Sequence, residues 1–143
     1  MPKKLKLTPE YNYKFQLYGI VSEAKEYTLS WSINKSAFIE LKKEDDLLIG
    51  VKGKGKIEVS NYSYSSDLLN IYLIKNTLEL DNSINQKFFI PSMWSFDYIL
   101  KIETEDNQPI SDDLFMQIRK TDKIQSILKL DVNKIKEKEY FLF

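Results

Sequence analysis

Residues 57–73 read IEVSNYSYSSDLLNIYL, and the alternation within them sets the expected fold class. Apolar or aromatic side chains take turns with polar ones on both sides of a Ser-Ser-Asp sequence at residues 65–67. Alternation with period two is typical of strands that bury one face, and small polar residues between two such runs are typical of a turn. We therefore predict strands over residues 57–64, where the alternation is broken, and over residues 69–73, where it is clean.

Further strands are expected on both sides of this pair. Upstream, residues 47–51 are apolar, and the lysines and glycines of residues 52–56 predict a hairpin connection. Residues 11–21 partly alternate and predict a strand or extended lead-in that ends near Gly19. Downstream, Pro91 interrupts an apolar run, and strands are expected over residues 96–102 and 124–130.

The first helix is expected over residues 23–37, with Ser22 as its cap. Within it, Ala24, Tyr27 and Trp31 share one face at helical spacing. The same segment also alternates with period two from Tyr27 to Ile33, which is strand spacing, so periodicity alone leaves both readings open. We favour a helix whose two faces are both covered by protein.

A second helix is expected over residues 111–120, because Ser111 is a good N-cap and acidic residues follow it in the first turn. Asp131 predicts the cap of a short carboxyl-terminal helical turn over residues 132–138. The sequence therefore predicts an α+β fold, with a mostly antiparallel sheet, two main helices and that short turn. No linker or repeat divides the chain, so residues 1–143 are expected to form a single domain.

Composition excludes several kinds of chemistry. The chain has no cysteine and no histidine, which removes thiolate nucleophiles, cysteine metal sites and the commonest general base. The acidic residues 103–107 resemble the start of a calcium loop, but Gln108 and Leu114 stand where such a loop needs glycine and glutamate. We therefore predict no catalytic residue, no metal site and no cofactor.

Charge and hydropathy bear on partners and location. The 21 basic residues balance 21 acidic ones, and Arg119 is the only arginine. A neutral chain with one arginine lacks the features of a dedicated nucleic-acid reader. No apolar run approaches the length of a membrane span. The sequence predicts a cytoplasmic protein that does not associate with membranes.

Residues 90–98 read IPSMWSFDY and carry a resemblance to a known family. Ile90, Pro91, Asp97 and Tyr98 match the signature of the IPExxxVDY family at its spacing. Phe96 replaces the valine of that signature. The chain also resembles the family at residues 18–20 and 26–29, and at residues 135–143 with their lysines and glutamates before an apolar end.

The resemblance implies a short cytoplasmic bacterial protein, and it brings no catalytic residue with it. Ser92 stands where the signature has glutamate, so a role that depends on that charge does not carry over. Pro91 predicts an extended Ile90 and a kink before the next strand. Asp97 is expected to accept hydrogen bonds from loop amides, and Tyr98 to anchor the strand with its hydroxyl partnered.

Our first hypothesis is a non-enzymatic protein-interaction or regulatory domain that binds another protein or a second copy of itself. The apolar carboxyl-terminal tail is expected to pack on the body of the domain or on that partner. The candidate binding residues are Trp94, Asp97, Tyr98, Phe141 and Phe143.

Two alternatives stay open. The first is a weakly RNA-associated protein that uses Lys52, Lys54 and Lys56 with nearby tyrosines such as Tyr62 and Tyr64. The second is an enzyme built on Asp97 with Tyr98 or a lysine, which requires a concave pocket around that carboxylate.

Overall fold

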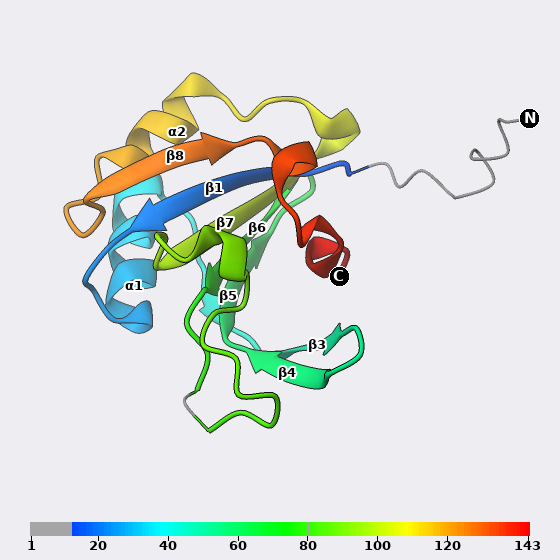
Figure 1. Cartoon of the computed structure of the whole chain (residues 1–143). Coiled ribbons are helices and arrows are strands. Elements are labelled where there is room, and N and C mark those ends of the chain that lie inside the picture. Colours follow the sequence, from blue (N-terminus) through cyan, green and yellow to red (C-terminus); the bar gives the residue numbers. More distant parts are fainter. Residues whose placement is uncertain (1–12, 80) are drawn as a thin grey trace, which may run out of the picture.

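An antiparallel sheet is the centre of the computed structural model, which describes residues 13–79 and 81–143 (Figure 1). In spatial order its strands are β2 (Lys42–Lys43), β5 (Asn61–Ser65), β6 (Leu69–Lys75), β7 (Tyr98–Thr104), β1 (Gln16–Val21) and β8 (Ser126–Leu130). A second sheet is the hairpin of β3 (Leu47–Val51) and β4 (Gly55–Val59). The helices are α1 (Glu26–Ala37) and α2 (Asp112–Arg119), and short 3-10 turns cover Pro91–Met93, Glu105–Asn107, Val132–Lys134 and Lys138–Phe141. The predicted α+β class with a single domain is confirmed.

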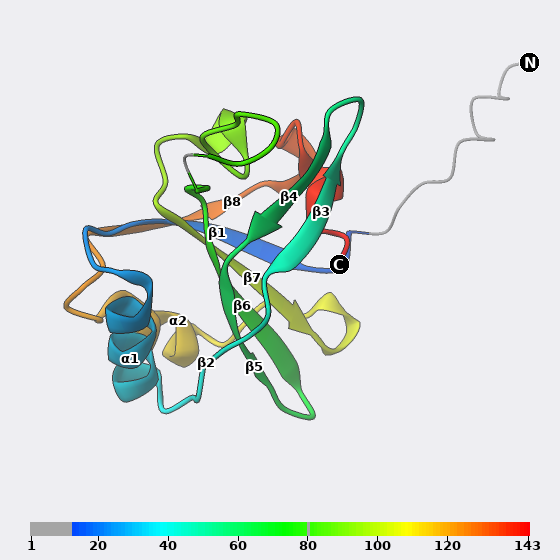
Figure 2. The ribbon, with the colours of Figure 1, turned by 90° about the horizontal axis from the view of Figure 1, so that it is seen from below.

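The large sheet separates two apolar cores, because its strands bury both faces. On one face, α1 and α2 cover Tyr18, Ile20, Leu100 and Ile102. On the other face, the β3–β4 hairpin and the carboxyl-terminal turns cover the side chains that alternate with these, such as Leu17 and Ile99. Figure 2 shows the two helices on one side of the sheet and the hairpin crossing the other.

The segment whose periodicity left helix and strand open is the helix α1. It begins at Glu26 rather than at residue 23, and Ser22 does not cap it. The Ser22 hydroxyl instead donates to the main-chain oxygen of Lys123 at 2.6 Å, which ties two loops together. The expectation that protein covers both faces of α1 is wrong: Leu29 and Ile33 are buried, but Tyr27 and Trp31 are exposed.

The other boundaries follow local sequence closely. Ser111 caps α2 as predicted, and its hydroxyl accepts a hydrogen bond from the main-chain N–H of Leu114 at 3.1 Å. Asp131 caps a 3-10 turn over Val132–Lys134, which is shorter than the predicted turn over residues 132–138 because Ile135 is extended, and a second 3-10 turn follows at Lys138–Phe141. None of the helices among the described residues is long and apolar enough to cross a membrane.

Several strands differ from their predicted limits. The strand predicted over residues 57–64 is two strands, because the chain leaves the hairpin after β4 at Val59 and enters the large sheet with β5 at Asn61. The strand predicted over residues 124–130 begins at Ser126. β1 continues through Gly19 to Val21, and residues 11 and 12 of the predicted strand lie outside the described residues. A Cβ at Gly19 would lie 2.5 Å from the ring of Phe96, so the glycine makes room for that ring within the strand. β7 begins at Tyr98 rather than at residue 96, because residues 94–97 complete the loop that carries the ring.

Candidate functional site

A buried asparagine shapes the loop that carries the IPSMWSFDY sequence. Asn76 follows β6 and is fully buried. Its side-chain Nδ2 donates to the main-chain oxygens of Met93 at 3.0 Å and Phe96 at 2.9 Å. Its Oδ1 accepts from the main-chain N–H of Ile90 at 2.9 Å. One side chain therefore satisfies three main-chain groups, so the loop has a defined shape.

Asn76 was missed in the sequence, where it opens a polar return between two strands. An asparagine directly after a strand is ordinarily a turn residue that faces water. The kink at Pro91 is as predicted: Ile90 is extended, and Pro91 opens a 3-10 turn that ends at Met93. Sequence thus located the kink but not the residue that holds it.

Asp97 and Tyr98 join the start of β7 to the loop that leads into α1. The Asp97 carboxylate accepts a hydrogen bond from the main-chain N–H of Ser22 at 2.9 Å. The Tyr98 hydroxyl donates to the main-chain oxygen of Ala24 at 2.6 Å. These are the amide contact and the partnered hydroxyl that the sequence predicts for this pair.

A hollow of about 660 Å³ opens beside these two residues. Residues 22–27, Lys75 and Thr77 form the rest of its wall. Its lining residues carry charges of both signs, with three acidic and two basic side chains: Glu23, Glu26, Asp97, Lys25 and Lys75. The concave surface that an Asp97-based enzyme requires is therefore present.

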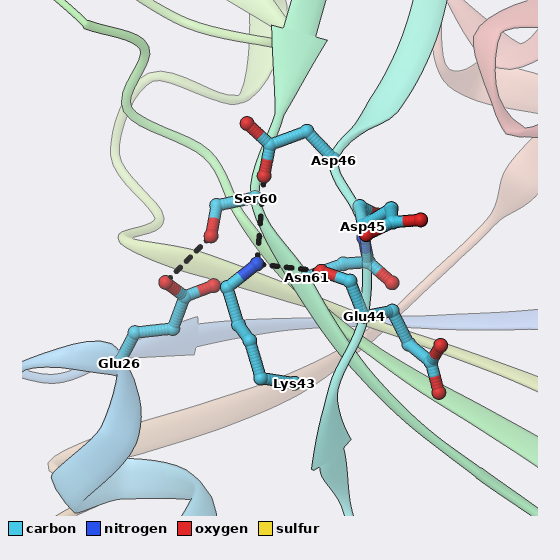
Figure 3. Close-up of polar contacts among 7 residues, drawn as sticks. All are labelled: Glu26, Lys43, Glu44, Asp45, Asp46, Ser60 and Asn61. Atoms are coloured by element: carbon cyan, nitrogen blue, oxygen red, sulfur yellow. Dashed lines mark hydrogen bonds and ion pairs between the residues drawn. The ribbon is translucent and has the colours of Figure 1, made fainter.

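Glu26, in the first turn of α1, links this hollow to the junction of β4 and β5 (Figure 3). One carboxylate oxygen accepts from the Ser60 hydroxyl at 2.7 Å, and the other is buried without a hydrogen-bond partner in the described part of the chain. Nearby, Lys43 Nζ donates to the main-chain oxygen of Glu44 at 2.7 Å and lies 3.4 Å from Asp46. No three acidic side chains in residues 13–79 and 81–143 gather closely enough to hold a metal ion.

Tyr98 is held in its protonated form within this hollow. Burial raises its pKa to about 12, and the nearby carboxylates of Glu26 and Asp97 add to the rise. A phenol with that pKa keeps its proton at neutral pH and serves as a fixed hydrogen-bond donor. The hydrogen bond from this hydroxyl links the start of β7 to the loop before α1.

We expect Tyr98 to make the fold sensitive to alkali. Its folded pKa lies above the ordinary value of 10.0, so its stabilising contribution is complete below pH 10 and disappears as pH rises towards 12. Between about pH 9 and about pH 11, the free energy of unfolding should fall by about 1 kcal/mol more in the wild type than in Tyr98→Phe. Urea titrations of both proteins at several pH values measure the difference, and parallel pH curves would contradict it.

The exposed aromatic side chains gather on α1 rather than on the predicted tail. Tyr27, Trp31 and Lys35 follow one another at spacings of four residues, which places them along one side of α1, and Phe38 follows at the carboxyl-terminal end of that helix. We call these four residues the α1 stripe. Tyr27 is 62% exposed, Trp31 is 63% exposed and Phe38 is 88% exposed, and Lys35 Nζ lies 5.2 Å from the Trp31 ring centroid. Tyr27 also lines the hollow, so the stripe runs up to its rim.

Trp94 is exposed as expected, at 68%, just after the 3-10 turn of the loop. The spacing of Tyr27 and Trp31 was visible in the sequence. This spacing did not reveal that the stripe is exposed, because aromatic residues on one helix face have the same spacing whether that face is buried or exposed to water.

The carboxyl-terminal tail packs on the body of the domain. Phe141 is fully buried between Phe15 and Phe89, at ring-centroid distances of 6.2 Å and 5.5 Å. The Phe143 ring centroid lies 3.8 Å from Nζ of the buried Lys101. Since the Phe141 ring is part of a core, it is not available as a contact surface in the folded domain.

Lys101 is the most unusual buried residue of this core. Its ammonium lies 3.2 Å from a Glu103 carboxylate oxygen and within about 5 Å of the rings of Phe15 and Tyr72. Burial lowers its pKa, and Glu103 opposes that effect. The lysine therefore joins the centre of the sheet to the tail by a cation–π contact with Phe143.

The residues of the RNA alternative are not brought together. The lysines of the β3–β4 hairpin are exposed, and the hairpin packs against the face of the large sheet opposite to the helices. Tyr62 and Tyr64 pack on the helix side of the sheet. A strand of nucleic acid that touched the hairpin lysines would not meet those tyrosines on the same face.

The fold and the site together define a small α+β domain with an exposed aromatic helix face beside a mixed-charge hollow. Comparisons with protein-family models, with curated proteins and with solved structures find no match to this chain. The resemblance of residues 90–98 to the IPExxxVDY signature therefore stays a prediction.

Proposed function

We propose that this chain is a non-enzymatic protein-interaction domain that binds a partner protein through the α1 stripe. The observation that carries the proposal is the exposure of three aromatic side chains on one element, with Tyr27 and Trp31 along one side of α1 and Phe38 at its carboxyl-terminal end. Aromatic side chains dominate the energetics of protein interfaces, because each buries a large area at a small cost in conformational entropy. The adjoining hollow gives a bound segment a recess into which one of its side chains fits.

The backbone of Phe38 supports this proposal independently. Phe38 lies just after α1 with φ 56° and ψ 45°, the left-handed conformation that usually belongs to glycine at a helix end. A residue with a Cβ pays about 1 kcal/mol for this conformation. The exposed ring gains nothing from packing that offsets the cost, so stability alone favours glycine here. A strained and exposed aromatic residue fits a site that is used for binding.

We further propose that the chain belongs to the IPExxxVDY family and is a cytoplasmic bacterial protein. This part rests on the four signature positions, Ile90, Pro91, Asp97 and Tyr98, and on their structural roles. Pro91 sets the kink, and the last two residues join β7 to the loop before α1. Because that loop positions the amino-terminal end of α1, the signature residues orient the α1 stripe.

The two tryptophans of the chain, Trp31 and Trp94, provide a direct test. Each single-tryptophan protein, Trp94→Phe or Trp31→Phe, has one fluorescent reporter on one of the two exposed surfaces. Partners are captured from an extract of the source cells on the immobilised chain, purified, and added to each variant. The emission of Trp31 should move to shorter wavelength on binding while that of Trp94 does not. A shift of Trp94 alone would place the contact on the loop and contradict the proposal.

Phe38→Gly should separate binding from stability. We expect its free energy of unfolding to rise by about 0.5–1 kcal/mol, because glycine relieves the left-handed strain. Partner capture should be lost at the same time. The matched control is Phe38→Ala, which removes the ring but keeps the strain, so it should lose capture without gaining stability. If both variants still capture the partner, Phe38 is not part of the interface.

A further inference from the structure

The large sheet has an open edge at β8. This strand pairs with β1 alone, and no other segment of the described chain makes a main-chain hydrogen bond to residues 126–130. In Figure 1, β8 lies at the outer rim of the sheet. The outward N–H and C=O groups of such a strand are a template on which another strand can pair.

The two edges of the sheet differ in how they resist pairing. β2 is two residues long and both are lysines, which is the usual protection of an exposed edge. β8 is five residues long, reads SILKL, and has a single charge at Lys129. The protection that β2 has is therefore missing from β8.

Leu128 is the central residue of β8 and is 56% exposed. It lies opposite Gly19 of β1, and Phe96 occupies the space above that glycine. Along β8, Leu130 packs with the core under the hairpin, and Ile127 packs with the core under the helices. By the alternation of a strand, Leu128 shares the hairpin face with Leu130.

We infer that β8 pairs antiparallel with β8 of a second copy of this chain, with Leu128 on the two-fold axis. This register uses all five residues of each strand. It places Leu128 opposite Leu128, Ile127 opposite Lys129, and Ser126 opposite Leu130. The two large sheets become one continuous sheet, and the interface is self-complementary, as a two-fold dimer requires.

Charge favours a second copy as the occupant of this edge. The register sets no lysine directly opposite another lysine, whereas the same pairing at β2 would set Lys42 against Lys43. The net charge of the chain is zero, so no general repulsion keeps two copies apart. The dimer uses a surface other than the α1 stripe and does not depend on it.

Sedimentation equilibrium from about 1 µM to about 500 µM tests the dimer. The wild type should pass from monomer to dimer in this range. Leu128→Lys places two like charges on the axis and should raise the dissociation constant at least tenfold, and so should Leu128→Glu. An equimolar mixture of the two variants should dimerise again, because opposite charges then meet. Leu48→Lys is the matched control, since Leu48 is a similarly exposed leucine on strand β3 (61%), and it should leave the dimer unchanged.

A single cysteine locates the axis, because the natural chain has none. Leu128→Cys should form a disulfide-linked dimer under mild oxidation much faster than Lys129→Cys, since only residue 128 faces its own copy. Three results would each overturn the inference: a wild type that stays monomeric throughout, an equal loss of dimer in Leu48→Lys, or equal cross-linking at residues 128 and 129. The inference would also be wrong if the chain stayed monomeric and its β8 edge paired only with an added extended peptide.

Discussion

Replacing Asn76 by leucine should lower the free energy of unfolding by about 3–5 kcal/mol. The leucine side chain has the same branching and the same number of heavy atoms and is larger in volume, so no cavity is left and the loss comes mainly from the hydrogen bonds. The main-chain oxygen of Phe96 and the main-chain N–H of Ile90 would be left without a hydrogen-bond partner, and the oxygen of Met93 would keep only its bond from the N–H of Phe96. Each unsatisfied buried group costs about 1–3 kcal/mol. Domains of this size have little more stability than that to lose.

Urea unfolding followed by circular dichroism measures this change, and Asn82→Leu is the matched control. The Asn82 side chain also bonds three main-chain groups of its own loop, in Glu79 and Gln86. Asn82 is only half-buried, so water can replace those bonds and the cost should stay below about 1.5 kcal/mol. Equal losses in the two variants would show that the Asn76 bonds are not the ones that hold the loop.

Replacing Phe141 by alanine should also destabilise the domain by about 3–5 kcal/mol. The ring is fully buried and packs against Phe15 and Phe89, so its removal leaves a cavity beneath the tail. The neighbouring Leu142 is exposed, and Leu142→Ala should cost less than about 1 kcal/mol. Thermal and urea unfolding of the two variants provide the comparison.

The same pair of variants decides between the two roles of the tail. A core role predicts that Phe141→Ala loses stability and that partner capture falls only as far as the protein unfolds. If Phe141→Ala kept its stability and lost capture completely, the tail would be the contact surface and the α1 stripe would not. Deleting residues 141–143 cannot make this distinction, because the deletion removes a core residue along with the tail.

Much of the fold was predictable because its signals are local. The alternation in residues 57–73 places β5 and β6 on either side of the predicted turn, where the main-chain N–H of Ser66 donates to the oxygen of Leu69. The cap at Ser111 and the kink at Pro91 depend on the conformations that single residues favour or forbid. Such preferences act within a few residues, so sequence is sufficient to place them.

The candidate site was less predictable because side-chain exposure is not local. Tyr27 and Leu29 are both apolar members of α1, yet one is exposed and the other is fully buried. The difference depends on which side of the helix meets the sheet, and strands far along the chain decide that. The exposure of the α1 stripe therefore follows from the way α1 packs, not from the pattern of α1 itself.

The sequence IPSMWSFDY determines its own backbone conformation but not the contacts that its side chains make. By itself it specifies an extended Ile90, a turn at Pro91, and an acid and a phenol placed to bond a neighbouring loop. The identity of that loop, the support from Asn76 and the glycine that makes room for Phe96 come from segments 14 to 77 positions away along the chain. The burial of Lys101 also depends on other segments, because three rings from distant parts of the chain and the carboxylate of Glu103 surround its ammonium group. Backbone preferences are properties of short sequences, whereas burial and hydrogen-bond satisfaction exist only after distant segments have packed together.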